Sequence, residues 1–393
     1  MNELPDIDQV DFAFDEMPGE EMHRILHAYR DRGPLQSTHF MGLPAFIITG
    51  HRVLLDAFMD TEKFPPHRMY KTSFEGAIGE TFISMEDSRK HLAYRRLATP
   101  AFRSRAVARY QRDELAGLAH ELIDRLEGIR SFDLVETFTT RFPFLVISRL
   151  MGLPRDRESE FQDWAFALLN FRDDPATAMI AKEKLTEFLA PAVEERRREP
   201  RGDVISELIQ ARVGDRALSD EEIYSHIRLI FPTGGETTHG ALGNFFSLLL
   251  GSKSLWQRLR AEPARLEDAV EESLRLETPI AVLPRLSAET DIQFHGIEIP
   301  ANSWVLFAMA AANRDLEIFP EPDRFDLDRK SEESLTFGRG VKACPGSDLA
   351  RKNTTVAAQL LLERLPNLEL LDHEAALPRK SILRCPTALR MRA

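Results

Sequence analysis

The chain has little cysteine, with two residues in 393. Two cysteines cannot build a disulfide framework, so we expect free thiols and a reducing, cytoplasmic setting. No apolar run approaches the ~18 residues needed to cross a bilayer. The N-terminal stretch MNELPDIDQVDF is acidic and lacks an apolar core. We therefore expect neither a signal peptide nor a membrane anchor.

Positive charge is also in deficit, since 51 Lys and Arg face 63 Asp and Glu and give a net charge of −12. This balance favours solubility and argues against nucleic acid as the main partner. The chain is 43% hydrophobic and 29% charged, which is typical of a globular protein with a sizeable core. No repeat, low-complexity segment or Gly/Ser linker divides it.

Residues 85–270 read mostly as helices, because stretches such as RYQRDELAGLAHELIDRLEGI (from Arg109) repeat their apolar residues every three or four positions. The charged run VEERRREPRGDV (from Val193) predicts an exposed loop broken by proline. After residue 285 the runs DIQFHGIEIP, SWVLF, ILRC and ALRMR are of β type. The pattern predicts a mainly α protein with a small β region.

One of the two cysteines lies in an unusual stretch, FGRGVKACPG, which surrounds Cys344 with three glycines and an aromatic ring. The sequence after it, GSDLARKNTTVAAQLLLERLP, predicts a helix. A thiolate near a helix N-terminus is stabilised and can bind a metal, and the glycines would allow a flat group to approach. A buried structural cysteine is the commoner role of a lone thiol. However, the pattern F-G-x-G-x-x-x-C-x-G is expected by chance only on the order of one time in 10⁵.

The stretch resembles the haem-binding loop of the cytochrome P450 family, the haem-thiolate monooxygenases. The resemblance implies that Cys344 is the axial ligand of the iron in haem b (iron protoporphyrin IX), where a thiolate favours O–O cleavage. It places Phe337, Gly338 and Gly346 against the porphyrin. Lys342 stands where the family usually has His or Arg, and would meet a haem propionate as a point charge.

Three further segments fit the resemblance on the cysteine side. Glu272 and Arg275 match the family's E-x-x-R pair, although such spacing alone would indicate a surface ion pair. Arg285 follows where the family has a propionate-binding arginine. The segment AANRDLEIFPEPDRFDLDR matches the stretch that packs on the pair. The resemblance implies that Arg314 and Arg324 complete a buried, structural charge network there.

His91 and Arg95, four residues apart in KHLAYRRLATPAF, share one helical face. The resemblance directs this face toward the propionates. Without the other motifs, a solvent-facing basic helix would explain the two residues equally well.

The stretch TGGETT, residues 233–238, lies between two segments that read as helical. Glycine inside a helix costs ~1 kcal/mol and Pro232 removes a hydrogen bond, so we expect one helix with a bend or bulge that opens a groove. A helix break with an N-cap is the alternative. The resemblance implies that Glu236 and Thr237 form the acid–alcohol pair that relays protons.

The resemblance covers roughly residues 20–393 and implies one triangular-prism, mostly helical domain over residues 1–393. It implies a monooxygenase that inserts one atom of O2 into an apolar small molecule. No flavin or ferredoxin module is visible, so electrons from NAD(P)H would arrive through a separate ferredoxin and ferredoxin reductase. We expect a monomer.

Family position also suggests a substrate pocket, although apolar residues in helices and strands belong to the core more often than to a pocket. The residues concerned are Phe82, Ile83, Leu229, Thr233, Ile280, Ala281 and Ile382. Their aliphatic character suits a terpenoid, steroid, fatty or aromatic compound without choosing among them.

A basic surface around the cysteine would suit an acidic ferredoxin, although a solvated helix start would look similar. Its members are Arg96, Arg103, Arg105, Arg339, Lys342, Arg351 and Lys352.

Three other functions stay open on the sequence. A peroxygenase would use hydrogen peroxide, but usually lacks the acid–alcohol pair. A non-catalytic haem-thiolate sensor would need no distal bend. A haem-free redox or zinc protein would need more Cys and His in ligand spacing. Cys385 reads as a small buried residue.

Overall fold

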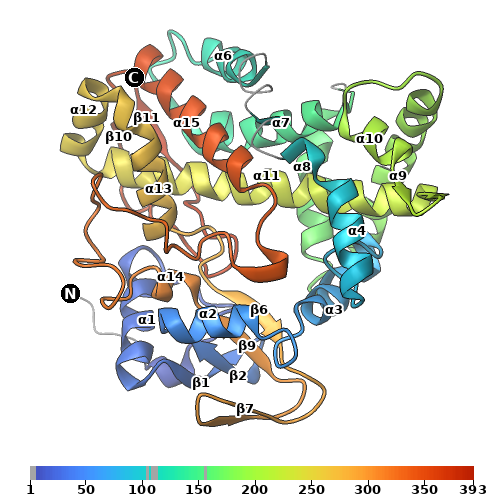
Figure 1. Cartoon of the computed structure of the whole chain (residues 1–393). Coiled ribbons are helices and arrows are strands. Elements are labelled where there is room, and N and C mark those ends of the chain that lie inside the picture. Colours follow the sequence, from blue (N-terminus) through green and yellow to red (C-terminus); the bar gives the residue numbers. More distant parts are fainter. Residues whose placement is uncertain (1–5, 103–105, 108–113, 155–156) are drawn as a thin grey trace.

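A computed structural model describes residues 6–102, 106–107, 114–154 and 157–393. Figure 1 shows a large helical part and, below it in that view, a smaller part built on a sheet near the N-terminus. The sheet has the strand order β1-β2-β9-β6, in which β1–β2 and β9–β6 are antiparallel and β2–β9 is parallel. Its strands are β1 (Leu35–Phe40), β2 (Leu43–Ile48), β6 (Leu283–Leu286) and β9 (Trp304–Phe307).

The helical part holds the largest hydrophobic cluster, and two smaller clusters pack around the sheet. The mainly α prediction is therefore confirmed. The helices are α1 (Glu20–Arg32), α2 (His51–Met59), α3 (Pro66–Ile78), α4 (Ser88–Ala98), α6 (Ala116–Asp124), α7 (Arg141–Met151), α8 (Glu158–Leu169), α9 (Pro175–Arg198), α10 (Val204–Gln210), α11 (Asp220–Gly251), α12 (Lys253–Ala261), α13 (Leu266–Leu276), α14 (Met309–Ala312) and α15 (Ser347–Arg364).

Short strands complete the fold. The run around His295 and Gly296 forms the predicted hairpin, because both residues adopt positive φ, of 46° and 80°. Residues 382–385 form no strand apart from one bridge between Arg379 and Cys385. The remaining strands are β3 (Ser131–Asp133), β4 (Arg212–Val213), β5 (Arg216–Ala217), β7 (Ile292–Phe294), β8 (Ile297–Ile299), β10 (Glu369–Leu370) and β11 (Arg390–Arg392).

The loop that we expected from Val193 is wrong for its first residues, which are helical. Helix α9 continues through Arg198, and only the residues after it leave the helix. Arg196 is buried rather than solvated, because its guanidinium donates to the Asp203 carboxylate at 2.7 Å and to the Gly152 carbonyl at 2.9 Å. Of the helix predicted from Arg109, α6 is the described part, and residues 109–113 lie outside the described residues.

Helix α11 crosses the helical part of the molecule (Figure 1) and is one helix, as predicted. Ser219 and Glu222 cap its start reciprocally, which satisfies two orphan N–H groups. The predicted bulge is absent, since residues 233–238 stay α-helical throughout. Gly235 serves packing instead, because a Cβ there would overlap the Phe144 ring of α7. The segment therefore brings two helices close together.

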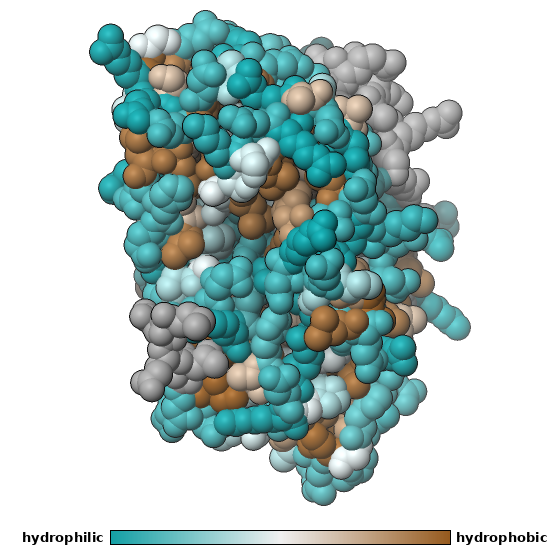
Figure 2. Space-filling model, turned by 90° about the vertical axis from the view of Figure 1, so that its left-hand side faces the viewer, coloured by the Kyte–Doolittle hydropathy of each residue, from teal (hydrophilic) through white to brown (hydrophobic). Residues whose placement is uncertain are grey.

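The face of the molecule in Figure 2 is mainly hydrophilic, with apolar side chains in separate small patches. Among the described residues, no helix is both long enough and apolar enough to cross a bilayer.

Candidate active site

Cys344 lies three residues before α15, in a loop shaped by glycine. Gly338 and Gly340 adopt φ of +66° and +72°, and a Cβ on Gly340 would press on the Phe58 carbonyl at 3.0 Å. The Cys344 N–H donates to the Phe337 carbonyl at 2.9 Å, which closes the loop. A thiol is thus held at a defined place before a helix N-terminus.

Burial raises the pKa of the Cys344 thiol, while the Gly346 N–H and the charges of Arg95 and Arg351 act in the opposite direction. The side chain is nevertheless accessible, because it opens into a cavity. A positive charge such as a metal ion in that cavity would favour the thiolate further.

Three cationic side chains gather beside this loop. The Arg95 guanidinium donates to the Ala343 carbonyl, and Arg285 lies over the Tyr70 ring at 5.3 Å. Burial, together with repulsion from Arg285 and Arg95, lowers the pKa of Lys342 to about 7. Among the described residues, no carboxylate pairs with any of the three. His91 is buried beside Lys342, with Nδ1 3.0 Å from the Lys342 Nζ.

Opposite the cysteine loop, α11 presents Thr233 and Thr237 to the cavity. The Thr237 hydroxyl donates to the Thr233 carbonyl at 2.7 Å, so its lone pairs stay available to a group in the cavity. Glu236 does not line the cavity, although it is the neighbouring residue. Its side chain is buried, its Oε2 has no hydrogen-bond partner among the residues that the structure describes, and burial raises its pKa to about 7. The structure therefore does not bring the two members of the predicted pair together in the cavity.

The cavity between these elements has a volume of about 280 Å³. It brings together Cys344, Phe337, Gly338, Gly346, Lys342, Arg95, Arg285, Thr237, Phe82, Ile83, Leu229, Thr233 and Ile280, all of them predicted site residues. His91 lies behind its wall. Ala281 and Ile382 lie outside the lining, because both pack into the cluster beside the sheet. Sequence reasoning missed Phe58, Tyr70, Phe102 and Leu283, which also line the cavity and carry no motif.

Comparisons with known proteins identify this arrangement. The family model for cytochrome P450 matches residues 164–380. The chain is 33% identical over 391 residues to cytochrome P450 CYP107DY1 of Priestia megaterium, covering 93% of this chain and 95% of the relative. The chain belongs to the cytochrome P450 family.

Solved structures agree. Cytochrome P450 CYP267B1, a myxobacterial protein solved with myristic acid, has a TM-score of 0.87 and 28% identity, covering 95% of this chain and 96% of that one. P450BioI, solved with an acyl carrier protein ligated to hexadec-9Z-enoic acid, has a TM-score of 0.84 and 26% identity, covering 95% and 98%. The protein is thus a P450 monooxygenase, and the predicted fold is confirmed.

The residues present fit the family's haem. Three buried or half-buried cations that have no carboxylate partner within the described part of the chain match a group that carries two propionates. The accessible Cys344 thiol opens on the same cavity, and a thiolate is one of the ligands that can hold haem iron.

The predicted members Arg314 and Arg324 of the buried charge network both need correction. Arg275 donates to both oxygens of Glu272, at 2.8 and 2.7 Å, as the E-x-x-R spacing predicted. The third member is Arg329, whose Nε donates to Glu272 at 3.0 Å. The side chain of Arg324 is 61% exposed and pairs with Glu321, because the turn it occupies directs it outward.

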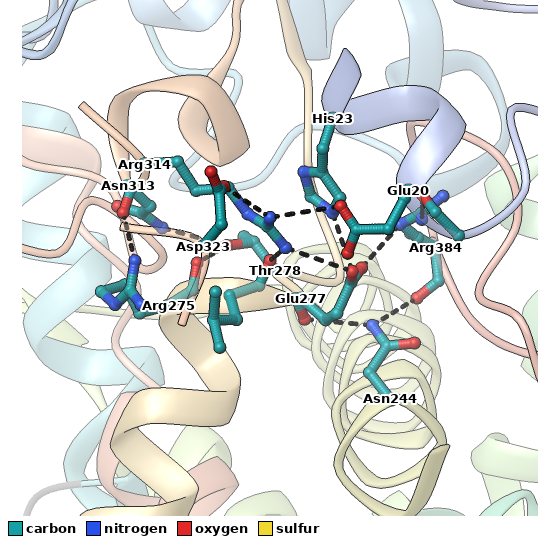
Figure 3. Close-up of polar contacts among 12 residues, drawn as sticks. Glu20, His23, Asn244, Arg275, Glu277, Thr278, Asn313, Arg314, Asp323 and Arg384 are labelled. Atoms are coloured by element: carbon teal, nitrogen blue, oxygen red, sulfur yellow. Dashed lines mark hydrogen bonds and ion pairs between the residues drawn. The ribbon is translucent and has the colours of Figure 1, made fainter. Parts of the chain in front are cut away.

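Arg314 is buried, but it belongs to a second network that sequence reasoning missed (Figure 3). It lies 3.6 Å from Glu277, which also accepts hydrogen bonds from Arg384 at 2.8 Å and from His23 at 2.7 Å. Burial raises the pKa of Glu277, but Arg384 and His23 outweigh that effect and hold it well below its usual range. The members are up to 361 residues apart in the sequence, which left no local signal.

The predicted basic surface around the cysteine is only partly basic. Lys342 turns inward, Arg351 pairs with Glu271, and Lys352 pairs with Glu267. Arg96 is exposed, and Arg339 donates to the Glu332 carbonyl at 2.7 Å. Arg103 and Arg105 lie outside the described residues.

Proposed function

We propose that the protein inserts one atom of dioxygen into an apolar small molecule held between α11 and the cysteine loop, with NAD(P)H electrons delivered by a separate ferredoxin and its reductase. The observation that carries this proposal is the shared cavity, which places Cys344 and Thr237 on one space with mainly apolar walls. We propose the cytoplasm as its compartment, because both cysteines are free thiols.

Haem, when bound, supplies the activation of oxygen. Cys344 would bind its iron, and Arg95 and Arg285 would hold its propionates. Lys342 adds positive charge to the same end of the cavity.

On the other side, Thr237 would hold a proton at Oγ1, since its hydroxyl is already oriented by the Thr233 carbonyl. Glu236 would exchange a proton near neutral pH, because burial raises its pKa to about 7. Phe82, Ile83 and Leu229 exclude water and hold an apolar substrate by burying its surface.

The test is turnover with a ferredoxin, its reductase and NADPH under ¹⁸O2, over a panel of terpenoids, steroids, aromatics and fatty acids. Fatty acids enter the panel because two neighbours were solved with them. We expect a product that carries one ¹⁸O atom. A product that forms only with hydrogen peroxide, or tight substrate binding without any product, would contradict the proposal.

A further inference from the structure

The wall of the cavity includes a turn at residues 81–84 whose main chain is held in an unusual way. The Ser84 N–H donates to the Thr81 carbonyl at 3.0 Å, and the Thr81 N–H donates to the Ser84 hydroxyl at 3.1 Å. Phe82 and Ile83, which lie between Thr81 and Ser84 in this turn, line the cavity. Among the described residues, their carbonyls accept no main-chain N–H. Both carbonyls are part-buried and need partners, so side chains must supply them.

Two side chains supply these partners: His91, whose Nδ1 lies 2.6 Å from the Phe82 carbonyl, and Lys342, two residues before the cysteine, which reaches both carbonyls. The Lys342 Nζ donates to the Phe82 carbonyl at 2.8 Å and to the Ile83 carbonyl at 2.8 Å. The Lys342 Nζ also lies 3.0 Å from Nδ1 of His91, which donates to the Phe82 carbonyl. Two of the three N–H donors of the ammonium are therefore taken by the two carbonyls.

We propose that Lys342 is a positioning residue that ties the cysteine loop to the substrate-facing turn at Phe82 and Ile83. This rests on the proposed function, because the turn matters only if a substrate binds against it. The propionates then fall to Arg95 and Arg285, two guanidiniums for two carboxylates. Lys342 would thereby act on substrate binding rather than on cofactor retention.

The rest of the contacts around Phe82 support a held wall. The centroids of the Phe82 and His226 rings lie 6.0 Å apart, and the angle between the ring planes is 28°. The Arg95 guanidinium lies 5.9 Å from the Phe82 ring centroid. A compact ammonium can reach two successive carbonyls, whereas a guanidinium presents its donors in one plane. Lysine at this position therefore suits the turn better than arginine would.

The test uses the haem-loaded protein and two nitrogen ligands, imidazole and 4-phenylimidazole, titrated through the shift of the Soret band. Both would bind the haem iron through an imidazole nitrogen, but only 4-phenylimidazole carries a phenyl ring that can extend toward the cavity wall at Phe82 and Ile83. We expect Lys342→Met to weaken 4-phenylimidazole by about five- to tenfold more than imidazole. Amide exchange of residues 81–84 should also become faster. Lys330→Met, at an exposed lysine, is the matched control and should change neither.

Haem transfer to apomyoglobin separates the two roles. We expect Lys342→Met to release haem at nearly the wild-type rate, and Arg95→Met to release it much faster. An unchanged ratio of the two affinities together with unchanged exchange would overturn the inference, and so would haem loss equal to that of Arg95→Met. If Lys342→Met loads no haem, the same comparisons are made on Lys342→Gln, which keeps two N–H donors. If neither variant loads haem, the inference is overturned. A wild-type protein without a thiolate-type ferrous–CO band would instead refute the proposed function.

Discussion

Thr237 and Glu236 are neighbours in the sequence but face different surroundings. Thr237 lines the cavity, whereas the Glu236 carboxyl is buried away from it, and its Oε2 lacks a hydrogen-bond partner in the described part of the chain. The Glu236 carboxylate also acts on Cys385: burial, and then this charge, raise the pKa of that thiol to about 12. The hydroxyl is thus open to a group in the cavity, whereas the acid is not.

Thr237→Ala should lower the product formed per NADPH consumed and release hydrogen peroxide, because the cavity loses a hydroxyl that can hold a proton. The ratio of product to NADPH should fall severalfold, since positioned proton transfer contributes ~10²-fold or more to a reaction rate. Thr238→Ala is a matched control. Its hydroxyl donates to the Gly234 carbonyl at 2.9 Å and it lines the same cavity. Equal coupling in both variants and the wild type would remove Thr237 from the mechanism.

The raised pKa of Glu236 has a consequence for stability. In the folded protein this carboxyl stays protonated up to pH about 7, whereas the unfolded chain releases the proton near the ordinary value of 4.5. The folded state therefore loses stability as the pH rises between these values, by up to about 3 kcal/mol.

Glu236→Gln removes this titration, so its stability advantage over the wild type should grow from pH 5 to pH 7 and then level off. Thermal unfolding of the haem-loaded protein across that range measures it, with the exposed Glu363→Gln as control. An advantage that is the same at every pH would show that the carboxyl is not protonated by burial.

At the scale of elements, the charge network holds α13 against the loop that leads to the cysteine. Arg329 reaches Glu272 from that loop, and its guanidinium also donates to the Pro320 carbonyl at 2.7 Å. Removing one partner of a buried ion pair leaves the other uncompensated. The network is therefore a structural support rather than a part of the chemistry.

Arg329→Ala should cost about 3 kcal/mol, whereas Arg324→Ala should cost no more than about 1 kcal/mol because its ion pair is exposed. Urea unfolding of the haem-loaded proteins gives the comparison. If Arg324→Ala destabilised the protein as much as Arg329→Ala, our assignment of the third arginine would be wrong.

The sequence predicted what is local. The glycine pattern, the helix after Cys344 and the spacing of Glu272 and Arg275 could be read from neighbouring residues. It could not separate Arg324 from Arg329, because a turn decides which of the two side chains points inward. Long-range contacts such as Lys342 with Phe82, 260 residues away, leave no sequence pattern.

The same limit explains two other misses. Arg196 looked solvated because its partner, Asp203, comes after the helix has ended. Ala281 and Ile382 could not be told from pocket residues, because apolar side chains serve the core and a cavity equally well.

For the whole molecule, charge around the cysteine loop would control how the proposed electron donor docks. The net charge is −12, and Glu267 and Glu271 offset Lys352 and Arg351. An acidic ferredoxin would therefore meet less attraction than the basic residues alone suggest.

Glu267→Gln should speed reduction by an acidic ferredoxin at low salt by a fewfold, because it frees the charge of Lys352. The gain should shrink near 0.1 M salt, where the screening length is ~10 Å. Stopped-flow reduction measures it, with Glu363→Gln, on the same helix as Lys352, as the control. If the rate does not change at any salt concentration, the donor docks elsewhere.

The central claim is that Cys344 holds the haem iron as a thiolate. The ferrous–CO spectrum of the wild type, Cys344→Ser and Cys385→Ser tests it most directly. We predict the red-shifted Soret band of thiolate ligation in the wild type and in Cys385→Ser, and its loss in Cys344→Ser. A band that survives in Cys344→Ser, or that disappears in Cys385→Ser, would contradict the account.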